Sequence, residues 1–195
     1  LGNLRRASTP TRSVPRSRIL DWFPDGRALA VADQNSPEEP FNIIRISVET
    51  GERHQLTSAP LHSYGDSQPD VSPDGRTLAF TRSLSRDSSD IYIIPATGGE
   101  PRRLTFDDNV ITGLAWTEDG RSIVFSSERG ATAGAGSLWR LLVGESTSRS
   151  EPQQLSGIGP RAIVPAVASR GWLLAYQEYL ADTNLWRAAT TGLGS

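Results

Sequence analysis

A short turn followed by an apolar run recurs along the chain at an almost constant interval. In its clearest copy, residues 72–76 (Ser-Pro-Asp-Gly-Arg) precede the apolar run at 78–80, and serine, proline and glycine suit successive positions of a tight turn. Three further copies are centred on Gly26, Gly120 and Gly171, so that successive turn glycines lie 45 to 51 residues apart. Repetition at this period indicates repeated blades or solenoid units.

Short stretches of strand-like sequence surround each turn. In the first unit they cover residues 18–22, 28–32, 41–46 and 53–57, joined by polar or glycine-containing connections. The run at 28–32 is apolar at every position, as expected of a strand that lies between two neighbouring sheets. No window has a convincing helical period. The same order of elements recurs, which predicts repeat units at about residues 18–57, 67–105, 112–156 and 163–190.

Four antiparallel strands per repeat of this length are typical of a β-propeller blade. A single blade cannot bury both of its apolar faces, whereas blades stacked around an axis can. The sequence therefore predicts an all-β fold, a β-propeller or propeller segment of four four-stranded antiparallel blades. The last blade lacks its outer strand unless the N-terminus supplies it at about residues 5–9, and residues 4–9 resemble the end of the second unit at 101–105. Residues 1–17 are thus either a closing strand or a basic arm, and the units form a closed ring, an open arc, or an arc completed by another copy.

Tryptophans recur at matching places in the repeats. Trp22 and Trp116 occupy one such place, and Trp139 and Trp186 share another. Matching positions in a repeat predict side chains that lie in the core between blades. Trp172 breaks the repeat register, so it is the tryptophan expected at the surface.

The composition argues against several kinds of site and partner. The formal net charge is −2, with 20 basic and 22 acidic side chains, so no global field favours nucleic acid or a membrane surface. The chain has no cysteine, which excludes disulfides and thiolate metal sites and leaves the redox compartment undetermined. No run approaches the roughly 18 apolar residues of a membrane span, and no signal peptide is visible. Because the sequence begins at Leu1, we expect a fragment of a longer polypeptide.

The sequence offers little for catalysis. Its two histidines, His54 and His62, fall in a predicted outer strand and a loop, and the Gly-x-Ser-x-Gly elbow of serine hydrolases does not occur. The turn aspartates Asp25, Asp74 and Asp119 are expected to accept hydrogen bonds from nearby backbone amides. We therefore predict that this segment is not an enzyme and has no catalytic, cofactor-binding or metal-binding residues.

These motifs resemble the repeats of TolB-type β-propellers, which are relatives of the WD-type repeats. The resemblance covers about residues 18–190 and rests on the Pro-Asp-Gly-Arg turn, the strand at 90–94 and the Gly-Gly-Glu-Pro-Arg-Arg-Leu-Thr ending at 98–105. The fourth unit departs from it, because the Pro-Asp pair is missing there. The resemblance implies a non-enzymatic binding or scaffold module whose partner is a protein or peptide.

Two alternatives follow from narrower resemblances. Residues 119–127 and 182–187 are similar to C-terminal propellers of bacterial winged-helix regulators, which implies the sensor propeller of a membrane-anchored transcriptional regulator. Similar repeats also cap prolyl-oligopeptidase-type hydrolases, whose catalytic domain is not in this sequence. The resemblance alone favours a periplasmic or other extracytoplasmic location, and the compartment is otherwise unknown.

Propellers generally bind through loops at one mouth of their channel. The connections between second and third strands, predicted at 33–40, 82–89, 129–136 and 178–183, should therefore lie together on one face. We expect no direct nucleic-acid binding by this segment and no membrane span in it, and we expect a homodimer or part of a larger ring. The candidate contacts with a partner are Trp172, Arg86, Asp87, Arg129, Glu178 and Tyr179.

Overall fold

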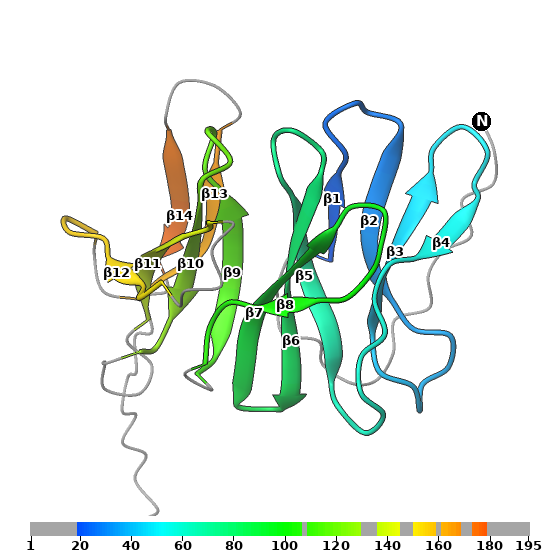
Figure 1. Cartoon of the computed structure of the whole chain (residues 1–195). Coiled ribbons are helices and arrows are strands. Elements are labelled where there is room, and N and C mark those ends of the chain that lie inside the picture. The colour runs from blue at the N-terminus through cyan, green and yellow to red at the C-terminus, as the bar shows by residue number, and fades with distance from the viewer. Residues whose placement is uncertain are drawn as a thin grey trace, which may run out of the picture.

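A computed structural model of the chain describes residues 19–106, 109–129, 136–144, 150–158, 161–168 and 173–178. These residues form three four-stranded antiparallel sheets and a two-stranded one, side by side in an arc (Figure 1). The predicted all-β propeller fold is thereby confirmed. The third strand predicted for the last unit and the closing strand predicted at 5–9 lie outside the described residues. No helix in the described part of the chain is long and apolar enough to cross a membrane.

Each sheet is one blade, and its strands follow one another in sequence order. Blade 1 consists of β1 (Leu20–Trp22), β2 (Ala28–Asp33), β3 (Asn42–Ser47) and β4 (Arg53–Gln55). Blade 2 consists of β5 (Gly65–Val71), β6 (Thr77–Ser85), β7 (Ser88–Pro95) and β8 (Arg102–Arg103). Blade 3 consists of β9 (Ile111–Trp116), β10 (Ser122–Ser127), β11 (Ser137–Leu142) and β12 (Gln153–Gln154). The described strands of blade 4 are β13 (Ala162–Val167) and β14 (Leu174–Glu178).

The hydrophobic core is divided among the joints between successive blades. In β6, Leu78 and Phe80 belong to the core between blades 1 and 2, whereas Ala79 belongs to the core between blades 2 and 3. Side chains along a strand alternate between the two faces of a sheet, so each blade gives one face to the blade before it and the other to the blade after it. The first strands β1, β5, β9 and β13 contact one another in that order along the inside of the arc.

The repeated turns adopt the local structure expected from their sequence. Gly75 has a φ of 71°, a left-handed conformation that glycine adopts at little cost. The carboxylate of Asp74 accepts hydrogen bonds from Ser72 Oγ at 2.6 Å and from the backbone amide of Arg76 at 3.0 Å. These bonds lower the pKa of Asp74, and the bond from Ser72 has the largest effect. The hydroxyl of Thr117 does the same for Asp119 in blade 3.

Two expectations about blades 1 and 2 are wrong. Residues 82–89 do not form a loop, because β6 extends to Ser85, β7 begins at Ser88, and only a two-residue turn joins them. Their polar sequence hides the pairing, since this end of the hairpin projects beyond the apolar core. Trp22 is 52% exposed instead of lying in a core between blades. The predicted place of Trp116 in such a core is confirmed.

Candidate functional site: the loop face

The connections between second and third strands and those between blades lie along one edge of the arc. Because every blade is antiparallel and starts from the same end, residues 34–41, 56–64 and 86–87 leave the sheets on the same side. They lie along the lower edge in Figure 1, opposite the repeated turns. We call this edge the loop face.

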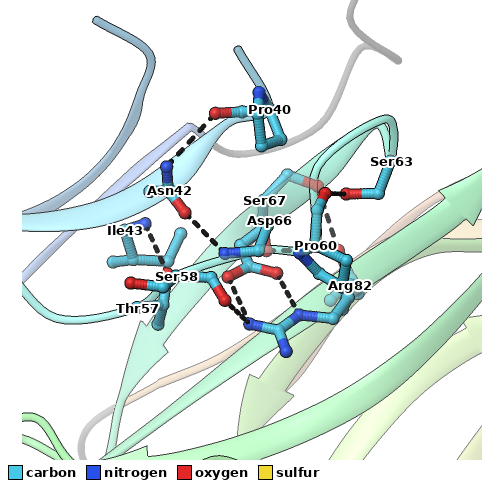
Figure 2. A network of polar contacts seen from close by, with 12 residues as sticks. Pro40, Asn42, Ile43, Thr57, Ser58, Pro60, Ser63, Asp66, Ser67 and Arg82 are labelled. Carbon is cyan, nitrogen blue, oxygen red and sulfur yellow. Dashed lines mark hydrogen bonds and ion pairs between the residues drawn. The ribbon is translucent and has the colours of Figure 1, made fainter.

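A buried ion pair fixes the loop face where blade 1 meets blade 2. Asp66 is completely buried, and Arg82 donates to it twice, from Nε to Oδ1 at 2.7 Å and from Nη2 to Oδ2 at 2.9 Å. Arg82 Nη2 also donates to the carbonyl of Ser58 at 3.3 Å, and the guanidinium lies 5.1 Å from the ring centroid of Tyr92. Figure 2 shows Asp66, Arg82 and Ser58 converging. A two-pronged pair of this kind fixes both position and orientation.

The electrostatics of this pair favour a permanently charged arginine. Burial lowers the pKa of Arg82, but the hydrogen-bonded Asp66 carboxylate raises it, and the net direction is upward. Breaking the pair would leave a buried charge without compensation, which is costly in a protein interior. The ion pair therefore holds the chain between the two blades in place.

A second set of hydrogen bonds holds the connecting segment that runs from blade 1 to blade 2 (Figure 2). Asn42 Oδ1 accepts from the amide of Ala59 at 2.7 Å, and Thr57 Oγ1 accepts from the amide of Ile43 at 2.9 Å. Further along, the hydroxyl of Ser63 donates to the carbonyl of Pro60 at 2.6 Å and closes a turn. Side chains thus take over the hydrogen bonding that a loop would otherwise leave to water.

This fixed segment presents exposed apolar side chains. Leu61, Tyr64 and Leu84 are all exposed at the loop face, and we call them the apolar loop patch. The amide of Tyr64 donates to the carbonyl of Ser83 at 3.0 Å, and Gly65 pairs with Ser83, so Tyr64 and Leu84 are cross-strand neighbours. Sequence reasoning missed this patch, because single apolar residues in a polar loop carry no signal of their exposure.

The sequence-predicted contact residues fall in different blades. Arg86 and Asp87 are exposed at the tip of the β6–β7 turn, two and three residues beyond Leu84, so they border the apolar loop patch. Trp172 and Tyr179 lie outside the described residues.

Arg129 and Glu178 belong to blades 3 and 4. The guanidinium of Arg129 lies 5.4 Å from the ring centroid of Trp139, and its Nη1 is 3.9 Å from Glu151. Glu178 is exposed at the end of β14, opposite Ala162. The structure therefore joins two of the predicted contacts to the patch and leaves these two on other blades.

The described residues contain no group of three or more histidine, cysteine, aspartate or glutamate side chains that could hold a metal ion. His54 lies in β4 with an exposed side chain, and His62 lies in the turn between Pro60 and Ser63 with a φ of 69°. The loop face carries the apolar loop patch with Arg86 and Asp87 beside it, and residues 34–41 add the exposed Glu38 and Glu39.

Comparisons with known proteins agree with this architecture. The model of the TolB beta propeller domain matches residues 13–187 of the chain. A protein of Bacillus subtilis (strain 168) named "Uncharacterized peptidase YuxL" is 35% identical over 113 residues, which are 56% of this chain and 17% of that protein.

Two solved structures share the fold. TolB from Acinetobacter baumannii has a TM-score of 0.69 at 24% identity, over 85% of this chain and 38% of that one. The tricorn protease has a TM-score of 0.56 at 12% identity, over 76% of this chain and 18% of that one. At such identities the likeness concerns the fold alone, and the chain spans a minor part of each protein.

Proposed function

Since the chain belongs to the TolB β-propeller domain family, we propose that it is a non-enzymatic binding module that holds a protein or peptide partner on its loop face. The observation that carries the proposal is the apolar loop patch, exposed on a segment that buried hydrogen bonds and the Arg82–Asp66 pair hold in place. Propellers offer such loops on a rigid scaffold.

The physical argument concerns the cost of ordering an interface. Exposed apolar side chains gain free energy when a partner removes them from water, about 25 cal/mol for each Å² of apolar surface. That gain is reduced when the binding loop must first be ordered. Because the backbone of the segment at 57–64 is already hydrogen-bonded, little of this cost remains for a partner.

The flanking charges restrict the partner. Arg86 and Asp87 place one charge of each sign at the edge of the patch. A peptide with an apolar anchor beside a charged residue fits this arrangement, whereas a polyanion such as nucleic acid would meet both an attractive and a repulsive group.

A peptide-display selection against the chain tests the proposal with a matched pair of variants. Leu84 at the loop face and Val48, which lies between β3 and β4 on the edge of the arc opposite the loop face, are each 52% exposed. We expect Leu84→Glu to weaken the selected peptides by about tenfold or more, the loss typical of an interface hot spot, and Val48→Glu to leave them unchanged. Equal effects of the two variants, or none, would contradict the proposal. Thermal melts of both variants verify that they fold.

The peptidase-named relative favours a second candidate, in which the chain is the propeller cap of a prolyl-oligopeptidase-type hydrolase. In this role the propeller would again supply a surface and no catalytic residue. The sequence of the full reading frame separates the two candidates. A Gly-x-Ser-x-Gly elbow in an α/β-hydrolase pattern, continuous with this chain, would favour the cap.

A further inference from the structure

Each strand of blade 2 contributes one charged side chain to a single row near the loop face. Strand pairing places Asp66 of β5 opposite Arg82 of β6, and Arg82 opposite Asp90 of β7. Arg103 of β8 is paired with Tyr92, and its Nη2 donates to Asp90 Oδ2 at 2.5 Å. Asp66, Arg82, Asp90 and Arg103 thus form a row across the whole blade, which we call the charged layer of blade 2.

The charged layer holds both of the connections that join blade 2 to its neighbours. Arg82 Nη2 donates to the carbonyl of Ser58 in the connection from blade 1 (Figure 2). Arg103 Nε donates to the carbonyl of Thr105 at 2.8 Å, at the start of the connection to blade 3. The hydroxyl of Thr105 in turn donates to Asp90 Oδ1 at 2.8 Å. The backbone on either side of blade 2 is therefore fixed before any partner binds.

Exposed apolar side chains lie beyond both ends of this layer. Tyr64 and Leu84, which belong to the apolar loop patch, stand two residues from Asp66 and Arg82 toward the loop face. At the outer end of the layer, the ring of Phe106 lies with its centroid 4.7 Å from the guanidinium of Arg103 and is 43% exposed. Phe106 follows β8 in a connection between blades, so it too belongs to the loop face. The charged layer therefore positions two separate apolar groups.

Between these two groups, Arg82 keeps a donor for a ligand. Its Nε and Nη2 bind Asp66 and Ser58, whereas Nη1 makes no hydrogen bond to any residue that the structure describes. The side chain is 11% exposed, and Nη1 is not sealed from solvent. Because Asp66 already compensates the charge of the guanidinium, a neutral acceptor such as a main-chain carbonyl suits Nη1.

The dimensions of the blade determine how far apart the two apolar groups lie. Tyr64 immediately precedes β5, Phe106 follows β8, and the four strands of the blade are neighbours in sequence order. Three strand spacings of about 4.8 Å separate β5 from β8 by roughly 14 Å. An extended chain rises about 3.3 Å per residue, so four residues cover about 13 Å. Residues four apart in such a chain also point to the same side.

The amount of exposed apolar surface favours a peptide over a folded partner. The apolar loop patch and Phe106 comprise four partly exposed side chains, so together they offer roughly a few hundred Å². A standard interface between folded proteins buries about 800 Å² on each partner. A short extended segment needs less area, because its main chain also forms hydrogen bonds.

We propose that the partner of the loop face is an extended peptide with two apolar side chains four residues apart. One of them contacts Tyr64 and Leu84, and the other contacts Phe106. A main-chain carbonyl between them accepts a hydrogen bond from Arg82 Nη1. This inference rests on the proposed function and specifies its partner, and it adds Phe106 and Arg82 to the residues that bind it.

A peptide library of restricted composition tests the spacing. Its members carry two leucine or phenylalanine residues separated by one to five serine or threonine residues, and they are selected on the unmodified chain. We expect enrichment of the members with three residues between the apolar positions, because their apolar side chains match the distance between Tyr64 and Phe106. Enrichment at another spacing, or at none in particular, would overturn the proposal.

A matched pair of aromatic variants tests the role of Phe106. Phe106 is 43% exposed at the loop face, and Tyr176 in β14 of blade 4 is 37% exposed. We expect Phe106→Ala to weaken the selected peptides by about tenfold, as for an interface hot spot, and Tyr176→Ala to leave them unchanged. Peptides that are sensitive to Leu84→Glu but not to Phe106→Ala would overturn this inference and leave the proposed function standing. Peptides insensitive to both would overturn both.

The role of Arg82 is tested by changing the peptide, because replacing Arg82 would break its buried pair with Asp66. Each carbonyl oxygen between the two apolar residues of a selected peptide is replaced in turn by sulfur, which is a weaker acceptor. We expect one of these thioamides to weaken binding to the unmodified chain by at least about threefold, as for the loss of a hydrogen bond to a charged donor. A thioamide outside the two apolar residues should have no effect. Unchanged affinity at every position would overturn the assignment of Arg82 Nη1.

Discussion

The joint between blades 1 and 2 and the joint between blades 3 and 4 come from the same repeat but are stabilised differently. In joint 1–2, Leu78 and Phe80 are completely buried within a large apolar cluster from both blades. A hydrogen bond from the amide of Val71 to Asp21 ties the first strands together. Large buried side chains and a satisfied donor thus act together at this joint.

Joint 3–4 has a smaller buried apolar cluster and no aspartate at the corresponding position. Among the described residues its buried core is Val124, Leu138 and Ala162, and Ala115 stands where Asp21 and Asp70 stand in the preceding blades. In a repeat protein the stability is approximately a sum of intrinsic repeat terms and nearest-neighbour interface terms. The recurring strand pattern therefore does not determine how stable a joint is, because the stability of each joint depends on the residues that pack there.

The largest expected effect compares two leucines that are both completely buried. Leu78→Ala in joint 1–2 should cost about 4 kcal/mol of unfolding free energy, and Leu138→Ala in joint 3–4 about 2 kcal/mol, within the range for buried leucine truncations. The difference is expected because the smaller cluster offers Leu138 fewer apolar neighbours. Urea titration of both variants measures it. A larger loss for Leu138→Ala would reverse the comparison.

A close backbone approach distinguishes joint 3–4. A Cβ atom at Gly113 would lie 2.7 Å from Val164 Cα and 2.9 Å from Pro165 Cδ, so β9 and β13 touch through a position with no side chain. Gly113→Ala should therefore cost about 1–3 kcal/mol through overpacking. Gly51→Ala is the control for steric crowding, because nothing lies within 4 Å of a Cβ there. Gly51 has a φ of 72°, so its variant reports the backbone strain alone. Similar losses in the two variants would argue against the close approach.

Removing the Asp70 carboxylate tests the hydrogen bond between blades 2 and 3, for which joint 3–4 has no equivalent aspartate. Asp70→Ala should cost about 1–3 kcal/mol, because the buried amide of Trp116 loses its acceptor. Asp70→Asn keeps an acceptor oxygen and should retain most of the stability. Chemical denaturation of the pair measures the difference. If alanine and asparagine at residue 70 were equally costly, the bond to Trp116 would not be what stabilises joint 2–3.

The period of the turns and the alternation within strands were enough to predict the blades. A strand such as β6 is recognisable because Leu78, Ala79 and Phe80 are apolar on both faces, which requires a sheet on each side. Exposure depends on neighbours that a repeat does not specify. Trp22 and Trp116 share a position and differ in burial, since one of them has a preceding blade among the described residues.

The loop face was less predictable for the same reason. Asp66 and Arg82 form a buried ion pair across two strands, but a pair so far apart in a polar sequence gives no local signal. The β6–β7 connection was expected as a long loop and is a tight turn. The sequence predicts the correct connection for Arg86 and Asp87, whereas Tyr64 is recognisable as a cross-strand neighbour of Leu84 only from the register of β5 and β6.

The smallest expected effect is that the difference in stability between joint 1–2 and joint 3–4 becomes smaller at low pH. The turns of blades 2 and 3 lie beside those of the preceding blades, since a Cβ at Gly75 would lie 3.5 Å from Pro24 and one at Gly120 3.7 Å from Pro73. Their aspartates have pKa values lowered by hydroxyl and backbone hydrogen bonds. The fourth unit has Arg170 at the corresponding position, so it has no such carboxylate.

A lowered folded-state pKa gives a definite sign. The stabilisation by Asp74 is fully present above the unfolded pKa of about 4 and is lost as the pH falls through the lower folded value. Because the side chain is largely exposed, we expect less than about 1 kcal/mol from it. Thermal midpoints of the wild type and Asp74→Asn, measured from neutral pH to about pH 2.5, should therefore differ at neutral pH and converge in acid. Parallel curves would mean that ionisation of the Asp74 carboxylate does not stabilise joint 1–2, and that the apolar cluster and the Val71–Asp21 hydrogen bond account for its advantage over joint 3–4.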